Sequence, residues 1–455
     1  MKRNIYIIVV ALLFSYTANS QSIRKNYQEM TLSERNSLVN AFYQLRTGPD
    51  LINDLAVFHG AFFNFDNSPD PTQPDIHFNL PDEPERDIFF AWHRRQIFEV
   101  EQAMQEIDPY ISIPYWNTTI DQSTTSSLWS ENFMGQFNSD WSLNRNLGGD
   151  DMLPMPSELT QVQSQTNFLL YSDLMERGPV HHGPHRWIGG AMAATVSPRD
   201  PVFYLVHSFI DKLWMEWEDL RQSSSYIRTN MIRYDGTYVF NGQTLPSVNP
   251  NSIINSRAYG VFYANNQLVQ LDQYTVNNTY NPLELFFYQY QIRAGNGFIV
   301  PPSRQARIES MTQIRLQPGF HAVDGSTFTA TIDDGTGQKN FMSIIRNQIP
   351  WDNRGIPIDW DAYRPQDDPH IKVTGNDIHI YPNPFTERIT LIASEYHDSW
   401  LLEVYDLSGR KLIERSYADA ASVTMDEVGM LKNGTYLIKI TINGNVISSS
   451  RIIKQ

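Results

Sequence analysis

The feature that most limits this chain of 455 residues is the complete absence of cysteine. Without cysteine there can be no disulfide, no thiolate nucleophile, no iron–sulfur cluster and no cysteine-ligated zinc. A catalytic site must therefore be built from histidine, carboxylates, hydroxyls or a bound cofactor. The chain contains 11 His, and their spacing is the strongest functional signal in the sequence.

The composition predicts a folded, acidic protein with more than one domain. Hydrophobic residues make up 41% and aromatic residues 13%, which supplies enough apolar surface for a genuine core. The length leaves room for about two to four domains. The net charge of −15 disfavours broad binding to nucleic acid or to anionic membrane surfaces.

The first twenty residues have the pattern of a secretory signal peptide. Lys2 and Arg3 precede an apolar run over 5–14, and small residues at 18 and 20 precede Gln21. This run is too short for a bilayer, which needs about twenty apolar residues. We predict that residues 1–20 are a signal peptide, that the chain is exported, and that it has no stable membrane span.

The C-terminal region, from about Asn376, alternates apolar and polar residues in short runs separated by turn signals such as Asn443-Gly444. This spacing predicts a small antiparallel β-sandwich over 376–455. The region resembles the C-terminal sorting domain of the type IX secretion system of Bacteroidetes in three motifs: Tyr381-Pro382-Asn383-Pro384, Val404-Tyr405-Asp406-Leu407-Ser408-Gly409-Arg410 and Gly434-Thr435-Tyr436. The resemblance implies an address that the outer-membrane export machinery reads and that is usually removed. A carbohydrate-binding or adhesive sandwich is the alternative.

The pattern between these ends is largely helical up to about Leu220. Thr31 and Glu34 form a capping box that predicts a helix start, and two more periodic segments begin near Phe89 and Asp200. Alternation at about 298–332 predicts a small β module at 291–335. We interpret the proline-containing stretch 336–375 as a linker, and we find no convincing internal repeat.

Six histidines fall into two groups of three, one on each side of a loop-like stretch at 118–150. The first group is His59, His77 and His93, and the second is His181, His185 and His207. The spacing of four between His181 and His185 places both imidazoles on one helix face. Neutral imidazoles without a carboxylate at ligand spacing argue against di-iron sites and zinc hydrolases. Such a ligand set favours two coppers, because it supports both Cu(I) and Cu(II).

Five motifs around these histidines resemble the tyrosinase family of type-3 copper proteins. They are Phe90-Ala91-Trp92-His93-Arg94, Ile113-Pro114-Tyr115-Trp116-Asn117, His185-Arg186-Trp187-Ile188-Gly189-Gly190, Ser197-Pro198-Arg199-Asp200-Pro201-Val202-Phe203 and His207-Ser208-Phe209-Ile210-Asp211-Lys212-Leu213-Trp214. The resemblance covers residues from about Ile23 to about Trp217. It implies a four-helix bundle around two copper ions, and the oxidation of phenols and catechols to o-quinones by O2.

The resemblance also implies which histidines bind each copper. The ligands of the first site would be His59, His77 and His93, and those of the second would be His181, His185 and His207. His77 is assigned as the remaining histidine in its interval, because Pro84 stands where bacterial relatives often hold this ligand. Many fungal and molluscan relatives tether one first-site ligand to cysteine. This chain cannot do so, and we expect loop packing alone to hold His77.

Two further residues are candidates for proton transfer. His182 stands where enzymes that hydroxylate monophenols often have an Asn that orients a water, and this water deprotonates the phenol. His182 would serve as a base or would only cap the helix. Its expected acidic partner is Glu176, with Asp173 as the second candidate. Solvated surface is the alternative for both acids.

Other residues near the ligands have predicted supporting roles. Asp211, four residues after His207, would orient a ligand imidazole or form a helix-end ion pair. Arg186 and Ala194 would line the substrate mouth. Val206 replaces a histidine that the family often holds there, so one supporting imidazole is missing.

The sequence therefore predicts a mainly α dicopper domain at 21–290, followed by β-rich C-terminal modules. The predicted protein is a secreted or cell-surface oxidase that converts o-diphenols, with monophenol hydroxylation left open. Its partners would be a phenolic substrate, O2 and the type IX secretion machinery. A dicopper oxygen-binding protein, as in haemocyanins, and an adhesive or binding protein with a defective site are the alternatives.

Overall fold

The structure is a computed structural model that describes residues 22–48, 50–62, 76–77, 88–149, 152–227, 229–277, 283–332, 378–381, 385–406 and 410–454. The predicted signal peptide and the predicted linker at 336–375 lie outside these residues. The chain divides into two compact units. One contains Met1–Pro154 and Gln165–Pro365, and the other contains Met155–Ser164 and Gln366–Gln455.

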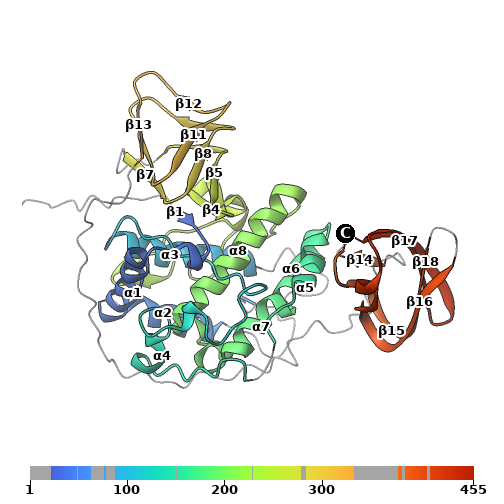
Figure 1. Ribbon diagram of the computed structural model, residues 1–455. Helices are drawn as coiled ribbons and strands as arrows, with labels where there is room; N and C mark the ends of the chain where they lie inside the picture. The colour runs from blue at the N-terminus through green and yellow to red at the C-terminus, as the bar shows by residue number, and fades with distance from the viewer. Residues whose placement is uncertain are drawn as a thin grey trace, which may run out of the picture. The chain divides into compact units, whose positions relative to one another are not determined.

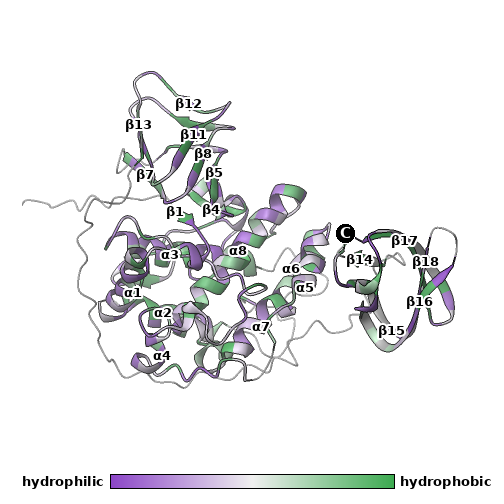
Figure 2. Cartoon of the chain, viewed as in Figure 1, coloured by the Kyte–Doolittle hydropathy of each residue, from purple (hydrophilic) through white to green (hydrophobic). Residues whose placement is uncertain are grey.

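Helices dominate the first part of the larger unit (Figure 1). They are α1 (Leu32–Thr47), α2 (Leu51–Ala61), α3 (Phe89–Gln105), α4 (Gln136–Asp140), α6 (Phe168–Arg177), α7 (Pro179–Ile188) and α8 (Pro201–Arg221). The smaller unit contains α5 (Pro156–Ser164). Figure 2 shows hydrophobic and hydrophilic positions within the same helices, as expected for helices that bury one face. Among the described residues, no helix is both long and apolar enough to cross a membrane.

Local capping explains where two of these helices begin. The Thr31 hydroxyl accepts a hydrogen bond from the Glu34 N–H, and the Glu34 carboxylate accepts one from the Thr31 N–H, so α1 starts with a capping box. The Asp200 carboxylate accepts from the Val202 N–H, and Pro201 occupies the first turn of α8. Both helix starts confirm the sequence predictions.

A buried ion network joins α3 and α8 to the strand β1 (Ser22–Arg24). Arg24, which is fully buried, lies 2.8 Å from the Glu101 carboxylate and 3.1 Å from the Asp211 carboxylate. Arg94 contacts the other oxygen of Asp211 at 2.5 Å. Because breaking one partner of a buried ion pair typically costs about 3–5 kcal/mol, this network holds the two helices in a defined relation.

The described residues of 261–277 and 283–332 form stacked strands on three faces. The faces are β5 (Leu268–Leu271), β8 (Gln291–Ala294) and β11 (Gln313–Leu316); β6 (Tyr274–Thr275), β9 (Phe298–Val300) and β12 (His321–Ala322); and β7 (Leu283–Tyr288), β10 (Gln305–Ser310) and β13 (Thr327–Ile332). Strands within each face pair in parallel. On the third face, Leu283 pairs with Gln305 and Gln305 pairs with Thr327, a repeat of 22 residues. The chain therefore winds as a short β-solenoid.

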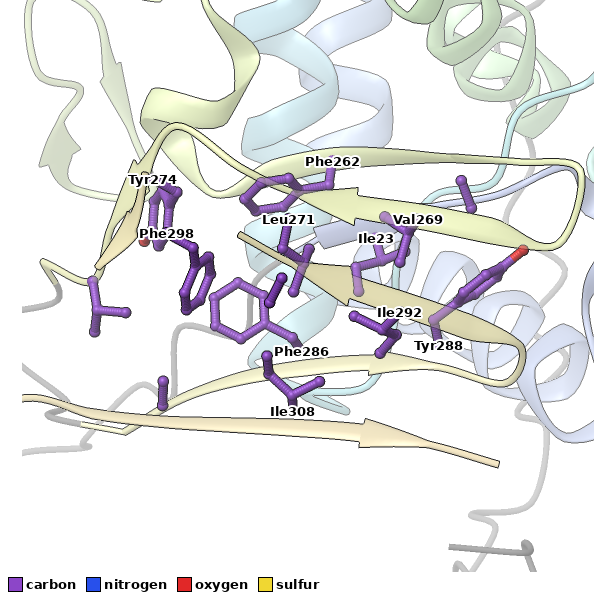
Figure 3. Packing of buried hydrophobic residues seen from close by; sticks show 14 of the residues in the cluster. Ile23, Phe262, Val269, Leu271, Tyr274, Phe286, Tyr288, Ile292, Phe298 and Ile308 are labelled. Atoms are coloured by element: carbon purple, nitrogen blue, oxygen red, sulfur yellow. The ribbon is translucent and has the colours of Figure 1, made fainter. Parts of the chain in front are cut away.

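The solenoid corrects two sequence predictions. The predicted start of the β module at 291 falls inside the stack, because β5, β6 and β7 supply its first layer. β4 (Val261–Asn265) pairs antiparallel with β5 and parallel with β1. A repeat is also present, although none was predicted. Figure 3 shows Tyr274, Phe298 and Phe286 together in the core, and Ile23 of β1 packs in the same cluster.

The rest of the smaller unit is built of antiparallel strands, as predicted, although the structure joins them in one sheet where the sequence predicted a sandwich. They are β14 (His379–Tyr381), β15 (Ile389–Tyr405), β16 (Lys411–Met425), β17 (Gly434–Ile442) and β18 (Asn445–Lys454). The strands form one continuous sheet rather than two separate ones, and a register shift divides the long pairing of β15 with β16. Trp400, Leu402, Ile438 and Ile440 are among the residues of its core.

Two short strands complete the described strands of the larger unit. β2 (Val239–Phe240) pairs antiparallel with β3 (Gln243–Thr244). Between them and α8, Arg233 is buried against α2 and α3, where it contacts Asp54 at 2.6 Å and Glu99 at 2.8 Å. The segment that follows α8 therefore covers the side of the helices that supply His59 and His93.

Candidate metal centre

The six predicted ligands are buried and come together as two triads. His59, His77 and His93 form the first triad, and His181, His185 and His207 form the second. Within each triad the candidate ligand atoms lie within 4.8 Å of one another, and each residue is at most 3% exposed. The structure therefore assembles the groups that the sequence spacing predicted.

The second triad comes from two consecutive long helices. His181 and His185 lie one turn apart on α7, with ring centroids 4.7 Å apart, and His207 lies on α8. The Nε2 atoms of His185 and His207 approach to 3.4 Å. The helical spacing explains how both α7 imidazoles face the same point.

The first triad comes from three separate segments. His59 lies near the end of α2 and His93 in the first turns of α3, whereas His77 belongs to the described pair Ile76–His77, which is not helical. The Ile76 N–H donates to the Phe62 carbonyl that follows α2, at 3.3 Å. This contact holds His77 close to the C-terminal end of α2, which carries His59.

The two triads face each other. The rings of His93 and His207 stack with centroids 4.2 Å apart and planes 12° apart. His77 and His181 are also nearly parallel, with centroids 5.8 Å apart. This arrangement places the two triads side by side.

Backbone carbonyls orient four of the ligands through their Nδ1 atoms. The donor and acceptor pairs are His59 to Thr195 at 2.5 Å, His93 to Phe89 at 2.8 Å, His181 to Glu176 at 2.7 Å and His185 to Met192 at 2.7 Å. A carbonyl can only accept, so Nδ1 must carry the proton and Nε2 presents its lone pair. These contacts select the tautomer that a metal requires.

The electrostatics of the triads fit positive ions. Burial lowers the pKa of His59 to about 3 and that of His185 to about 4, so both imidazoles are neutral at pH 7. The Nε2 atoms of His59 and His77 lie only 3.0 Å apart, and in the neutral tautomers two lone pairs face each other there. The buried Nε2 of His93 also has no hydrogen-bond partner among the described residues. A copper ion at each triad would satisfy these atoms.

Two aromatic rings pack against the ligands from the same helical position. Phe89 lies four residues before His93, with ring centroids 4.8 Å apart, and Phe203 lies four residues before His207, at 4.1 Å. Both rings are buried. They were visible in the sequence as neighbours on apolar helix faces, but sequence reasoning assigned them no functional role.

Glu176 lies at the centre rather than on the surface. Its side chain is 0% exposed, and its Oε1 lies 3.2 Å from Nδ1 of His77. Asp173 is also buried and pairs with Arg177 at 3.2 Å. The surface alternative for the two acids is therefore wrong, because both carboxylates are enclosed and contact cationic or N–H-bearing groups.

The remaining candidates have different surroundings. His182 is 4% exposed, and its ring lies 5.7 Å from that of His181. Arg186 is half-buried on α7, and Ala194 follows a short 3-10 turn over Gly190–Ala193. Proton transfer by His182 and a place for Arg186 and Ala194 at the substrate mouth stay predictions.

Asp211 does not touch a ligand imidazole among the described residues. Its carboxylate contacts Arg24, Arg94 and the Tyr263 hydroxyl. The ion-pair alternative describes this residue better than direct orientation of an imidazole. Asp211 binds Arg94, which follows His93, and this contact fixes α3 against α8. Asp211 therefore affects the position of the ligands only indirectly.

Comparisons with known proteins agree with this site. The chain matches the common central domain of tyrosinase over residues 49–165 and 138–220, and the secretion system C-terminal sorting domain over 379–455. A tyrosinase of Streptomyces antibioticus is 32% identical over 246 residues, which cover 45% of this chain and 86% of that protein. A tyrosinase of Streptomyces glaucescens is 26% identical over 245 residues, with the same coverage of 45% and 86%.

One solved structure of a similar protein is that of a recombinantly expressed latent aurone synthase, a polyphenol oxidase. It is 14% identical to this chain, and the similarity covers 95% of this chain and 90% of that one with a TM-score of 0.39.

Proposed function

Because this chain belongs to the tyrosinase family, we propose that it is an exported copper-dependent oxidase that converts o-diphenols to o-quinones with O2. The observation that carries the proposal is the pair of buried triads that face each other and contain only imidazoles. A cofactor with two metal ions suits this oxidation, because each catechol gives up two electrons and two protons. One O2 accepts the four electrons of two catechols and becomes two waters.

Two copper ions are the cofactor of this family, and when bound they supply the electron transfer between substrate and O2. His59, His77 and His93 would hold one ion, and His181, His185 and His207 the other. The protein's own contribution is to keep these imidazoles neutral and correctly oriented. Four backbone carbonyls hold Nδ1 protonated, and burial disfavours protonation at Nε2.

We infer that neighbouring side chains restrain the ligands and position the phenol. Phe89 and Phe203 each pack against ligands of both triads, so they restrict the rotation of the ligand imidazoles. We propose that His182, beside His181 on α7, takes the proton from the phenol hydroxyl. An imidazole suits this step because its ordinary pKa of about 6.5 lies close to neutral pH. Arg186 would contact the substrate at the mouth of the site.

The sorting-domain match indicates export through type IX secretion to the cell surface or the extracellular space. We propose that residues 1–20 direct the chain across the inner membrane and that residues 379–455 are then read by the outer-membrane machinery. Under this proposal the phenolic substrate is met outside the cell, where O2 is available.

The direct test is to load the purified full chain with copper and to measure copper content and quinone formation together. We expect two coppers per chain and quinone absorbance from catechols in air, with a His181→Ala variant as the inactive control. Reversible O2 binding without quinone formation would instead support an oxygen-binding protein. Copper content far below two would support an adhesive or binding role.

A further inference from the structure

We propose that Glu176 is the positioning residue that holds His77, and that it thereby links the two metal sites. This inference rests on the proposed function, because it assigns His77 as a copper ligand. It changes the predicted role of Glu176, which was expected as the acidic partner of His182. It also replaces the expectation that loop packing alone holds His77.

The first argument is the exceptional contact at His77. Four other ligands donate from Nδ1 to a backbone carbonyl, but Nδ1 of His77 faces the carboxylate of Glu176 at 3.2 Å. A hydrogen bond to a carboxylate is about twice as strong as one between neutral groups. His77 also lies outside the described helices, so its main chain supplies less restraint than a helix gives His59 or His93.

The second argument is the burial of Glu176. Its side chain is 0% exposed, and a carboxylate removed from water is costly unless hydrogen bonds compensate for the lost solvation. The N–H of a neutral imidazole supplies such a bond. The same contact requires Nδ1 of His77 to carry the proton, and it therefore turns the lone pair of Nε2 toward the first triad.

The third argument is that Glu176 contacts both triads through different atoms. Its carboxylate contacts His77 of the first triad, and its backbone carbonyl accepts from Nδ1 of His181 in the second, at 2.7 Å. One residue at the end of α6 thus orients one ligand at each metal position. A side-chain substitution removes only the first of these two contacts.

The corner after Glu176 is sterically defined. Gly178 joins α6 to α7, and a Cβ atom at this position would lie 2.1 Å from the Leu174 carbonyl oxygen. On the same helix, Asp173 pairs with Arg177 and leaves Glu176 as the carboxylate that reaches His77. The backbone at this corner, two residues after Glu176, therefore has little room to move.

The test uses copper retention by the full chain. Wild type, Glu176→Ala, Glu176→Gln and the control Asp173→Asn are loaded with copper and dialysed against increasing chelator, and the copper remaining per chain is measured. We expect Glu176→Ala to lose one copper at about 10–100-fold lower chelator activity than wild type, with the second copper retained. Glu176→Gln should lie between them, because its amide oxygen still accepts from Nδ1. Asp173→Asn should match wild type.

A double substitution separates positioning from a general loss of structure. In a His77→Ala background, Glu176→Ala should cause no further loss of copper, since both changes act on the same ligand. If Glu176→Ala does not fold, as judged by circular dichroism, Glu176→Gln and its double variant decide the question in the same way.

The inference is overturned if Glu176→Ala and Glu176→Gln both hold two coppers as tightly as wild type. A change in the ratio of tyrosine to catechol turnover at full copper content would then assign Glu176 to the substrate proton instead. The proposed function fails separately, and only if the wild type itself does not bind two coppers or does not oxidise catechols.

Discussion

Each triad consists of three imidazoles, but the two triads are assembled from different parts of the fold. The second is assembled from α7 and α8, which are close in sequence, and two of its ligands share one helix face. The first is collected from α2, α3 and a non-helical pair of residues, and one ligand depends on a carboxylate contributed by α6. One half of the candidate metal centre is therefore fixed by local helix geometry, and the other half is fixed by long-range contacts.

The largest expected effect is the loss of a ligand from either half. His77→Ala and His181→Ala should each lower the rate of quinone formation by at least about 100-fold, because the reaction requires both metals. The copper content should distinguish them. His77→Ala should retain the copper of the second triad, and X-ray absorption should show its remaining ligands as imidazoles. Equal activity of either variant with wild type would contradict the assignment.

Gly178→Ala should disturb both halves at once. A Cβ atom would lie 2.1 Å from the Leu174 carbonyl oxygen, so the corner between α6 and α7 must move, and Glu176 moves with it. We expect a loss of about 2 kcal/mol or more in the free energy of unfolding, together with weaker binding of both coppers. Gly48→Ala is the matched control, because its nearest neighbour is the Gln44 carbonyl oxygen at 3.5 Å. An unchanged melting temperature for Gly178→Ala would show that the corner is not restrictive.

The metal-free protein should become less stable as the pH falls. Burial holds the pKa of His59 at about 3 and that of His185 at about 4, below the value of about 6.5 for an unfolded histidine. The unfolded state therefore binds more protons between these values, and stability decreases as the pH drops below 6.5. Each of these two imidazoles should cost about 2 kcal/mol at pH 5.

The same measurement allows the two triads to be compared, because His59 belongs to the first triad and His185 to the second. Denaturant unfolding of the metal-free protein at pH 7 and pH 5 measures the pH dependence. His59→Phe and His185→Phe should each reduce the pH dependence. A free energy of unfolding that rises as the pH falls would contradict the buried, neutral state of both residues.

The smallest expected effect concerns substrate choice rather than copper. His182→Asn should change the ratio of tyrosine to dihydroxyphenylalanine turnover by roughly 10-fold, because it replaces a proton acceptor by an orienting amide. The copper content should remain at two, since His182 belongs to neither triad. If the ratio does not change, His182 has only a structural role in α7.

The second triad is easier to predict from the sequence than the first, because the residues that form it lie close together in the sequence. A spacing of four and an apolar stripe fix the faces of α7 and α8, and the resemblance covers this segment with dense motifs. His59 and His93 are also placed by helical context. The contact that orients His77 joins residues nearly one hundred positions apart, and no local pattern predicts which carboxylate reaches it.

The anchors of the other ligands could not be predicted either. The carbonyls of Phe89, Glu176, Met192 and Thr195 belong to the backbone, and a backbone atom has no sequence signal of its own. Only the path of the chain decides which carbonyl faces an imidazole. Whether Glu176 is buried could not be decided from the sequence for a related reason, because the sequence does not show that α6 ends against the triads.

The solenoid shows a different limit. Its strands are two to six residues long, so each contains too few alternations to reveal its length or its partners. The repeat is nevertheless present in the sequence, since Gln291-Ile292-Arg293 recurs as Gln313-Ile314-Arg315, 22 residues later and in register. A search at a fixed spacing, rather than for turns, would have found it.

A crystal structure of the copper-loaded protein, with anomalous diffraction at the copper edge, would show directly which residues bind each copper. We predict two copper peaks, one bound by His59, His77 and His93 and one by His181, His185 and His207, with Nδ1 of His77 on the Glu176 carboxylate. A single copper peak, or a first-site copper bound without His77, would contradict the account.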